Sequence, residues 1–305
     1  MQEYIDPHTL LIILCGIGMG TAARLVTLKI DTRQTPSFPN GMFISVFMGV
    51  VASFLGAVAI PALLARDLTA VTFLTLGVQH FREVRTTEKE SLEKLESVEF
   101  TKRGPAYIDG IAKTYESRYY ISLVTALAVV LALELLGRAE PAINLALALA
   151  VGLAVIALLR ALTKGKCVGD ICTLKEGKLT LEGSDLYVDG MFVTSQLGTD
   201  RSRALFLKEG VGFVITPKKK KFEITLNNYG QRQALLFEAT RTFGMKRFAF
   251  TRKSFKEGKI VLAFVPILRQ PEAIMDVLGK TPVLENSRKI HTLMQEPVVG
   301  GQANG

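Results

Sequence analysis

The sequence predicts an α-helical membrane domain of about five spans followed by an α+β domain. Long apolar runs occur only up to residue 162 of 305, and the remainder has short apolar runs between glycine and charged turns. The first 162 residues hold 14 basic and 14 acidic side chains, and the rest hold 23 and 14, so the net charge of +9 lies entirely in the second part. We therefore expect a membrane domain at residues 1–162, a basic domain at 163–296 and a disordered tail at 297–305.

Five apolar runs are the expected membrane spans. Two glycines in the first run, Gly16 and Gly20, have the spacing that lets helices approach closely. Arg24 near its end is expected to snorkel to the interface, and Pro61 is expected to kink or end the second run. The third run is short, so it reads either as a full span or as a re-entrant segment. The runs are Leu10–Leu28, Met42–Ala65, Leu68–Phe81, Tyr119–Leu136 and Ala142–Leu162.

The basic residues of the loops predict the orientation. Residues 82–118 contain eight Lys and Arg side chains, which favours a cytoplasmic location for this loop. If Leu68–Phe81 crosses the bilayer, five crossings place the N-terminus outside and the basic domain in the cytoplasm. The sequence therefore predicts an integral membrane protein with a cytoplasmic C-terminal domain.

The loop itself contains two expected helices. Thr87–Thr101 has a thin apolar stripe and reads as a surface helix that stops before Gly104. Pro105 suits the first position of a new helix, which carries apolar residues on one face and runs into the span that begins at Tyr119. Gly110 weakens this helix by roughly 1 kcal/mol, which indicates close backbone approach or a break. Tyr119 is expected at the membrane interface.

The basic domain is expected to have its strands first and its helices later, as an α+β fold. The expected strands are Lys178–Leu181, Leu186–Thr194, Ala204–Leu207, Gly212–Ile215, Phe222–Leu226, Arg247–Thr251 and Lys259–Val265. The expected helices are Gln231–Phe243, Pro271–Leu278 and Leu284–Met294.

The sequence YIDGIA at the start of the fourth-span helix carries a family resemblance. It closely resembles the motif that names the YIEGIA family of membrane proteins from endospore-forming bacteria, with Asp109 in place of the family's glutamate. The carboxylate is kept on a side chain that is one methylene shorter. The resemblance implies a sporulation-linked membrane protein, and it carries over no biochemical activity. The motif residues are Tyr107, Ile108, Asp109, Gly110, Ile111 and Ala112.

Two interpretations of this motif stay open. It is either a cytoplasmic element that binds partner proteins or takes part in catalysis, or a helix start that packs the loop onto the fourth span. Because Asp109 is predicted to share the cytoplasmic side with a domain of net charge +9, we expect the motif and this domain to dock.

A membrane-anchored protease is the main alternative to a non-catalytic role. Five spans and a strand-rich domain are similar to the aspartic protease that activates a sporulation sigma factor, but the Asp-Ser/Thr-Gly loop of that family is absent. The remaining candidates for an acid/base pair are Asp109, Asp185 and Asp189. The sequence offers no G-x-S-x-G motif, and its three histidines are scattered.

A run of four lysines, Lys218–Lys221, is the densest positive segment. We expect it to form a hairpin turn, either as a contact for anionic lipid or as a solvated turn that prevents edge pairing. Nucleic acid is not expected as a partner, because the alternation of aromatic and basic residues near Phe248 is also typical of a half-buried strand.

The cysteines give no disulfide framework, metal site or cofactor. Cys15, Cys167 and Cys172 are too few and too dispersed, which favours a reducing compartment. We therefore expect a protein that scaffolds or regulates other sporulation or spore membrane proteins through the YIDGIA segment and the basic domain. The alternative is an aspartate-dependent protease that acts on spore membrane proteins, and a transporter is a third class.

Overall fold

The computed structural model describes residues 6–31, 39–137, 140–254 and 258–287. The chain forms two compact units, which are Met1–Ser91 with Ile111–Lys164, and Leu92–Gly110 with Gly165–Gly305. We call them the helical unit and the mixed unit. The YIDGIA motif is divided between them, because Tyr107 to Gly110 belong to the mixed unit. The expected tail at 297–305 lies outside the described residues.

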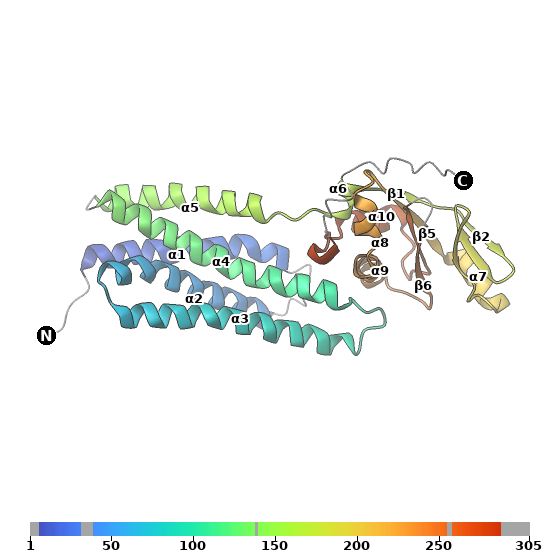
Figure 1. The fold of residues 1–305 in the computed structure, drawn as a ribbon, viewed down its shortest axis with the longest axis horizontal. Coiled ribbons are helices and arrows are strands. Elements are labelled where there is room, and N and C mark those ends of the chain that lie inside the picture. Colours follow the sequence, from blue (N-terminus) through green and yellow to red (C-terminus); the bar gives the residue numbers. More distant parts are fainter. Residues whose placement is uncertain (1–5, 32–38, 138–139, 255–257, 288–305) are drawn as a thin grey trace, which may run out of the picture. The chain divides into compact units, whose positions relative to one another are not determined.

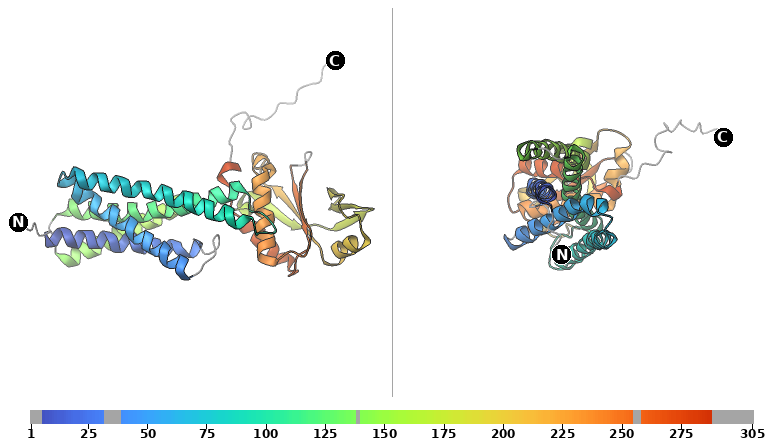
Figure 2. Two further views of the ribbon diagram at one scale, coloured as in Figure 1. Left: turned by 90° about the horizontal axis from the view of Figure 1, so that it is seen from below. Right: turned by 90° about the vertical axis from the view of Figure 1, so that its left-hand side faces the viewer.

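The helical unit is built from five long helices, which lie side by side in Figures 1 and 2. Four of them contain stretches that are long and apolar enough to cross a membrane, at Pro7–Leu28, Gly41–Leu64, Pro105–Leu136 and Pro141–Thr163. The helices are α1 (Pro7–Asp31), α2 (Pro39–Leu64), α3 (Leu68–Glu96), α4 (Pro105–Leu136) and α5 (Pro141–Thr163). The chain is therefore a membrane protein by the composition of these helices.

Helix α3 differs from its expected form. It is one continuous helix of 29 residues, whereas we expected a short apolar segment and a separate surface helix at Thr87–Thr101. Residues 82–86 contain no glycine or proline that would break the helix. Its charged second half keeps α3 outside the four candidate spans, so composition does not confirm about five spans. It ends at Glu96, before the expected end at Thr101.

Glycines on α1 fix the directions of its neighbours. A Cβ atom on Gly20 would lie 2.6 Å from Ser53 Oγ of α2 and 2.7 Å from the Ser122 carbonyl oxygen of α4. One turn earlier, a Cβ on Gly16 would lie 3.1 Å from Ala57 and 2.6 Å from Val130. As the contacts move to lower residue numbers along α1, they move to higher residue numbers along both α2 and α4. Helices α2 and α4 therefore run parallel to each other and antiparallel to α1. The expected small-residue packing is present.

Arg24 does not snorkel to an interface. Its side chain is fully buried among α1, α2 and α4. The guanidinium Nε donates to the Ser45 carbonyl oxygen at 3.2 Å, and its carbon lies 5.1 Å from the centre of the Tyr119 ring. Tyr119, expected at the interface, is likewise buried, because Arg24 and a stacked Phe81 cover its ring.

The mixed unit contains three layers, with a four-stranded antiparallel sheet in the middle. Its strand order is β1-β5-β7-β6, and a separate antiparallel sheet has the order β2-β3-β4. The strands are β1 (Cys172–Glu176), β2 (Leu179–Glu182), β3 (Asp185–Val188), β4 (Met191–Thr194), β5 (Val211–Pro217), β6 (Ala249–Lys253) and β7 (Ile260–Phe264). The helices are α6 (Val168–Ile171), α7 (Asp200–Glu209), α8 (Phe222–Asn227), α9 (Tyr229–Phe243), α10 (Pro271–Lys280) and the 3₁₀ turn Glu285–Ser287.

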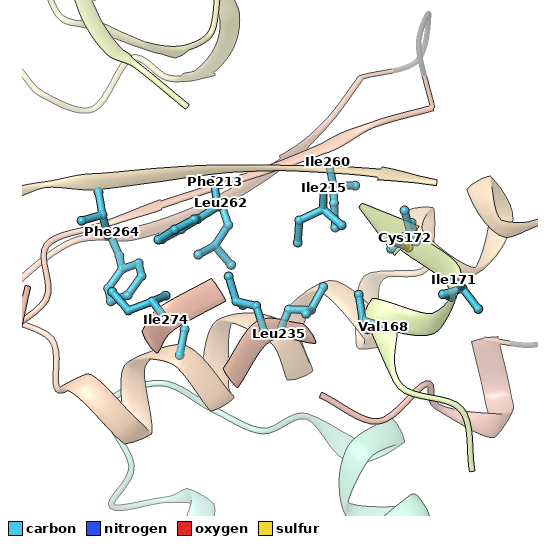
Figure 3. Packing of buried hydrophobic residues seen from close by; sticks show 14 of the residues in the cluster. Val168, Ile171, Cys172, Phe213, Ile215, Leu235, Ile260, Leu262, Phe264 and Ile274 are labelled. Atoms are coloured by element: carbon cyan, nitrogen blue, oxygen red, sulfur yellow. The ribbon is translucent and has the colours of Figure 1, made fainter. Parts of the chain in front are cut away.

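Each face of the middle sheet has its own core. Alternate residues such as Phe213 and Leu262 point toward Leu235 of α9 and Ile274 of α10 (Figure 3). The residues between them, such as Val214 and Val261, pack against the small sheet and Phe206 of α7. Strand β7 is therefore buried at all five positions. This explains its continuous apolar sequence, because both faces are covered.

Several expected strands are wrong. Ala204–Leu207 lies in helix α7, where the Thr199 side chain caps the helix by accepting the Ser202 N–H at 3.2 Å. Phe222–Leu226 lies in helix α8, so the strands and helices are interleaved rather than sorted along the chain. Strand β1 and helix α6 were not expected. Of the helix expected at Leu284–Met294, the described part contains only the 3₁₀ turn, and the rest lies outside the described residues.

Candidate functional site

The connection between α3 and α4 is shaped by one glycine. Gly104 has a φ of +87°, a conformation that disfavours a side chain. Its N–H donates to Glu96 Oε1 at 2.6 Å, and its carbonyl accepts the N–H groups of Tyr107 and Ile108, each at 3.1 Å. Pro105 is then the first residue of α4, as the sequence predicts. The turn at Gly104 therefore sets the direction of the first turns of α4, which contain the YIDGIA residues.

Tyr107 binds helix α9 of the same unit. Its side chain is 2 % exposed, and its hydroxyl donates a hydrogen bond to the Glu238 carboxylate, 131 residues away. Its ring packs edge-on against Phe237, with the ring centres 6.2 Å apart. We expected the motif to dock on the basic domain through Asp109. The contact with α9 is made by Tyr107, and its partner, Glu238, is acidic rather than basic.

Arg103 lies beside Tyr107 and is also buried. Its guanidinium carbon is 5.0 Å from the centre of the Phe237 ring, and Nη2 is 3.7 Å from the Glu99 carboxylate. Its Nε and Nη1 have no hydrogen-bond partner among the described residues. Burial, followed by the nearby charge of Arg241, lowers the pKa of this guanidinium. Arg103, Gly104, Tyr107, Gln233, Phe237 and Glu238 together form what we call the motif contact.

Helix α9 supports this contact because it has two packed faces. Leu235, Ala239 and Phe243 belong to the sheet core. Phe237 and Glu238 lie on the other side and receive Tyr107. The close fit extends to Gly104, where a Cβ atom would lie 2.5 Å from Gln233 Oε1. Helix α9 therefore joins the motif to the sheet.

The other motif residues differ in exposure. Ile108, Ile111 and Ala112 are buried, whereas Asp109 and Gly110 are partly exposed. The expected break or close approach at Gly110 is wrong, because α4 continues through it and a Cβ there would meet only Leu284 Cδ2, at 3.9 Å. Asp109 follows the first turn of α4, which contains no acidic residue.

The protease candidates do not form a carboxylate pair. Asp185 begins β3 and Asp189 follows its end, so about 13 Å of strand separates them. Asp109 and the small sheet lie on opposite sides of the layer formed by α9 and the middle sheet, which implies roughly 20 Å. A shared proton requires two carboxylates in contact.

Asp189 has an evident structural role. It and Gly190 have φ values of 49° and 77°, as in the two-residue turn that joins twisted strands. Its carboxylate accepts the Lys178 N–H at 2.7 Å and binds Lys175 Nζ at 2.6 Å. The Lys175 hydrogen bond, followed by the Lys178 N–H, lowers the pKa of this carboxyl group. It therefore stays ionised rather than serving as a proton donor.

The lysine run does not form the expected hairpin turn, because helix α8 follows it. Lys218 donates from Nζ to the Gly169 carbonyl oxygen at 2.7 Å, and Lys219 to Lys221 are exposed. Its strand, β5, lies between β1 and β7 and is not at the edge of the sheet.

The described residues contain no cluster of three or more His, Cys, Asp or Glu side chains that could hold a metal ion. Cys172 is buried in the sheet core, and this burial raises the pKa of its thiol to about 12. Such a thiol is neither a ready metal ligand nor a nucleophile at neutral pH.

Sequence reasoning missed Glu238 and Arg103 as partners of the motif. One sequence feature could have indicated Glu238 as a partner. Its carboxylate lies on a face of α9 that is otherwise formed by Ala234 and Phe237 and that faces away from the sheet. It also missed the enclosure of Arg24, for which Gly49 makes room. A Cβ on Gly49 would lie 2.4 Å from Arg24 Cγ.

Comparison with known proteins identifies relatives over nearly the whole chain. Residues 12–293 match the family described as YIEGIA protein. The chain is also 34% identical over 312 residues to the "Uncharacterized protein YphB" of Bacillus subtilis (strain 168), covering 98% of this chain and 100% of that protein. No solved structure matches.

Proposed function

The chain belongs to the YIEGIA family, and we propose that it is a sporulation-associated integral membrane protein that scaffolds or regulates partner proteins without catalysis. The observation that carries this proposal is the motif contact. Four of the six motif residues are buried, and Tyr107 is bonded to the protein's own α9. We infer that the motif holds the α+β domain at the start of α4. A partner would reach the motif through Asp109 and Gly110.

An exposed apolar surface in the mixed unit supports partner binding. Leu207 of α7 and Ile267 and Leu268 of the segment after β7 are each more than half exposed. Arg269 Nη1 donates to the Lys208 carbonyl oxygen at 3.1 Å, which keeps these two segments together. Clustered exposed apolar residues are typical of protein interaction sites. The proposed partners are other membrane proteins of the spore.

Aspartate-dependent proteolysis is the rival function, and the separations between the three candidate carboxylates argue against it. The test expresses Asp109→Asn, Asp185→Asn and Asp189→Asn variants in a sporulating host that lacks the native protein. A scaffold predicts that the Asp185→Asn and Asp189→Asn variants restore heat-resistant spores, and that none of the three variants leaves membrane proteins uncut. Uncut membrane proteins that accumulate with any one normally expressed variant would establish the protease instead.

The scaffold has its own test in the exposed apolar surface. A Leu207→Glu and Ile267→Glu double variant should accumulate normally and fail to restore spore formation, because a charge in an apolar interface is unfavourable. Leu95→Glu is the matched control, since Leu95 is also exposed, at 40 %. Full restoration by the double variant would remove this surface from the proposal. If a strain that lacks the protein sporulates normally, the proposed link to sporulation is wrong.

We also propose that α3 crosses the bilayer as a fifth span. If α2 and α4 both cross while running parallel, the chain between them has to return across the membrane, and α3 is the helix in that stretch. The apolar segment Leu68–Phe81 covers about 21 Å of a hydrocarbon core of about 30 Å, so the remaining thickness of about 9 Å would be met by the next two turns of α3. This supports an outside N-terminus and a cytoplasmic α+β domain.

A reporter experiment tests this topology. Five spans and a four-span alternative with the N-terminus inside both place residues 82–104 and the α+β domain in the cytoplasm. They differ at the N-terminus, in the loop after α1 and in the connection between α2 and α3. Reporter fusions at Met1 and after Arg33 should therefore report outside and inside, respectively, for five spans. The reverse pair of results would establish the four-span alternative.

A further inference from the structure

Four lysines form a surface beside the first residues of the α+β domain. Lys219, Lys220 and Lys221 are exposed in the connection from β5 to α8, and Lys166 is exposed just before α6. We call these four residues the lysine surface. None of them makes an ion pair with a carboxylate among the described residues. The nearby Asp170 carboxylate accepts the Cys167 N–H at 2.8 Å and so serves the local backbone.

Lys218 fixes this surface in place. Its backbone N–H donates to the Ile171 carbonyl oxygen at 2.9 Å, and its Nζ donates to the Gly169 and Asp170 carbonyl oxygens at 2.7 and 3.3 Å. The lysine run is therefore tied to α6. Lys218 is a structural member of the run, and the other three lysines are available to a ligand.

The segment before α6 is also fixed to the domain. The Lys166 carbonyl oxygen accepts the Val283 N–H at 2.9 Å, and the Val168 N–H donates to the Thr281 carbonyl oxygen at 2.9 Å. Lys166 is three residues from Gly169, a reach of about 10 Å at most. All four lysines therefore belong to one small region of the mixed unit.

This region follows a membrane span directly in the chain. Candidate span Pro141–Thr163 ends three residues before Lys166, and exposed Lys164 lies between them. Clusters of basic residues next to a span on its cytoplasmic side attract anionic lipids. The competing explanation, in which lysines protect a sheet edge, does not apply because β5 is an inner strand.

We propose that the lysine surface binds the headgroups of anionic lipids in the leaflet that α5 leaves. Each lysine near such a leaflet strengthens binding by roughly fivefold. The inference goes beyond the proposed function, because it applies equally to a scaffold and to a protease. Lipid binding would restrain the α+β domain next to the bilayer.

Lysine acylation of the full-length protein tests the proposal. The protein is placed in nanodiscs of neutral phosphatidylcholine, or of the same lipid with about 30 % phosphatidylglycerol. A water-soluble amine reagent is added, and the rate at each lysine is read by mass spectrometry. Two exposed lysines serve as internal controls, Lys178 just before β2 and Lys208 in α7.

We expect anionic lipid to slow acylation of Lys166, Lys219, Lys220 and Lys221 by several-fold, with no change at the controls. About 1 M salt should remove the protection, because it shortens the Debye length to about 3 Å. A Lys219→Gln, Lys220→Gln and Lys221→Gln variant, which keeps Lys218, should co-purify with less phosphatidylglycerol than a Lys178→Gln, Arg201→Gln and Lys208→Gln variant.

Two results would overturn the proposal. Equal acylation rates in neutral and anionic nanodiscs would show that lipid headgroups do not cover the lysines. Protection in neutral nanodiscs by glycerol phosphate or by an oligonucleotide, without protection by phosphatidylglycerol, would assign the surface to a soluble anion.

Discussion

The hydrogen bond between Tyr107 and Glu238 can be removed with a single atom change, Tyr107→Phe. The phenyl ring keeps its edge-on contact with Phe237, and only the donor to the carboxylate is lost. A hydrogen bond to a charged group contributes about 1.5–3 kcal/mol. Because Glu238 is only half-buried, water can replace part of the interaction, so we expect about 1.5 kcal/mol. The opening equilibrium of the motif contact should therefore rise roughly tenfold.

Hydrogen exchange of the full-length protein measures this change. Amides of residues 104–112 and of the Phe237 side of α9 should exchange roughly tenfold faster, since local opening controls their exchange. Strand β7 should keep its protection, because its core lies on the other side of α9. Tyr229→Phe is the matched control, since Tyr229 begins the same helix and is 68 % exposed.

A double-mutant cycle with Glu238→Gln separates the pair from indirect effects. If the two residues act through their mutual bond, the second substitution should add little to the first. The reasoning is refuted if the amides of residues 104–112 exchange at the same rate in the Tyr107→Phe variant as in the Tyr229→Phe variant.

Three further predictions test other parts of the fold. Gly104→Ala should lower the free energy of unfolding of the purified protein by at least about 1 kcal/mol, because φ at Gly104 is +87° and an added Cβ would lie 2.5 Å from Gln233. Gly110→Ala in the motif should be neutral or stabilising. Equal losses of stability in the two variants would contradict this prediction. Arg24→Gln should lower the melting temperature in detergent far more than Arg82→Gln, because Arg24 is fully buried and Arg82 is exposed, and a small loss at Arg24 would refute its enclosure. Asp189→Asn should keep its turn and cost less than about 1 kcal/mol at neutral pH. Since the folded-state pKa of Asp189 is lowered, its contribution is present above the unfolded pKa of about 4 and is lost as pH falls through the folded value, so melting curves of the variant and the native protein should converge in acid.

Part of the site could be read from local sequence. Pro105 after Gly104 marked the start of α4, and the apolar spacing of Tyr107, Ile108 and Ile111 marked a face that is buried in the structure. These features depend on neighbours within a few residues. The partner of Tyr107 is 131 residues away, and no local periodicity specifies that pairing. The net charge of the basic domain does not identify this pairing either, because net charge carries no information about which side chains meet.

Errors in the fold have a similar origin. Ala204–Leu207 and Phe222–Leu226 are apolar runs of strand length that belong to short helices, and their form depends on a cap at Thr199 and on packing beneath β5. Strand β7 was evident, because burial on both faces requires an uninterrupted apolar run. Strand β1 was not, because only its first residue is buried.

The sequence by itself determined that this chain has apolar helices able to span a membrane, a separate α+β domain and a motif at the base of α4. Composition and period are enough for this, since they record which environment each segment needs. Only the tertiary structure decided that Tyr107 binds Glu238, that Arg24 is enclosed and that α2 and α4 run parallel. These features depend on side chains far apart in the chain, whose fit is fixed by shape and burial when the helices and sheets pack.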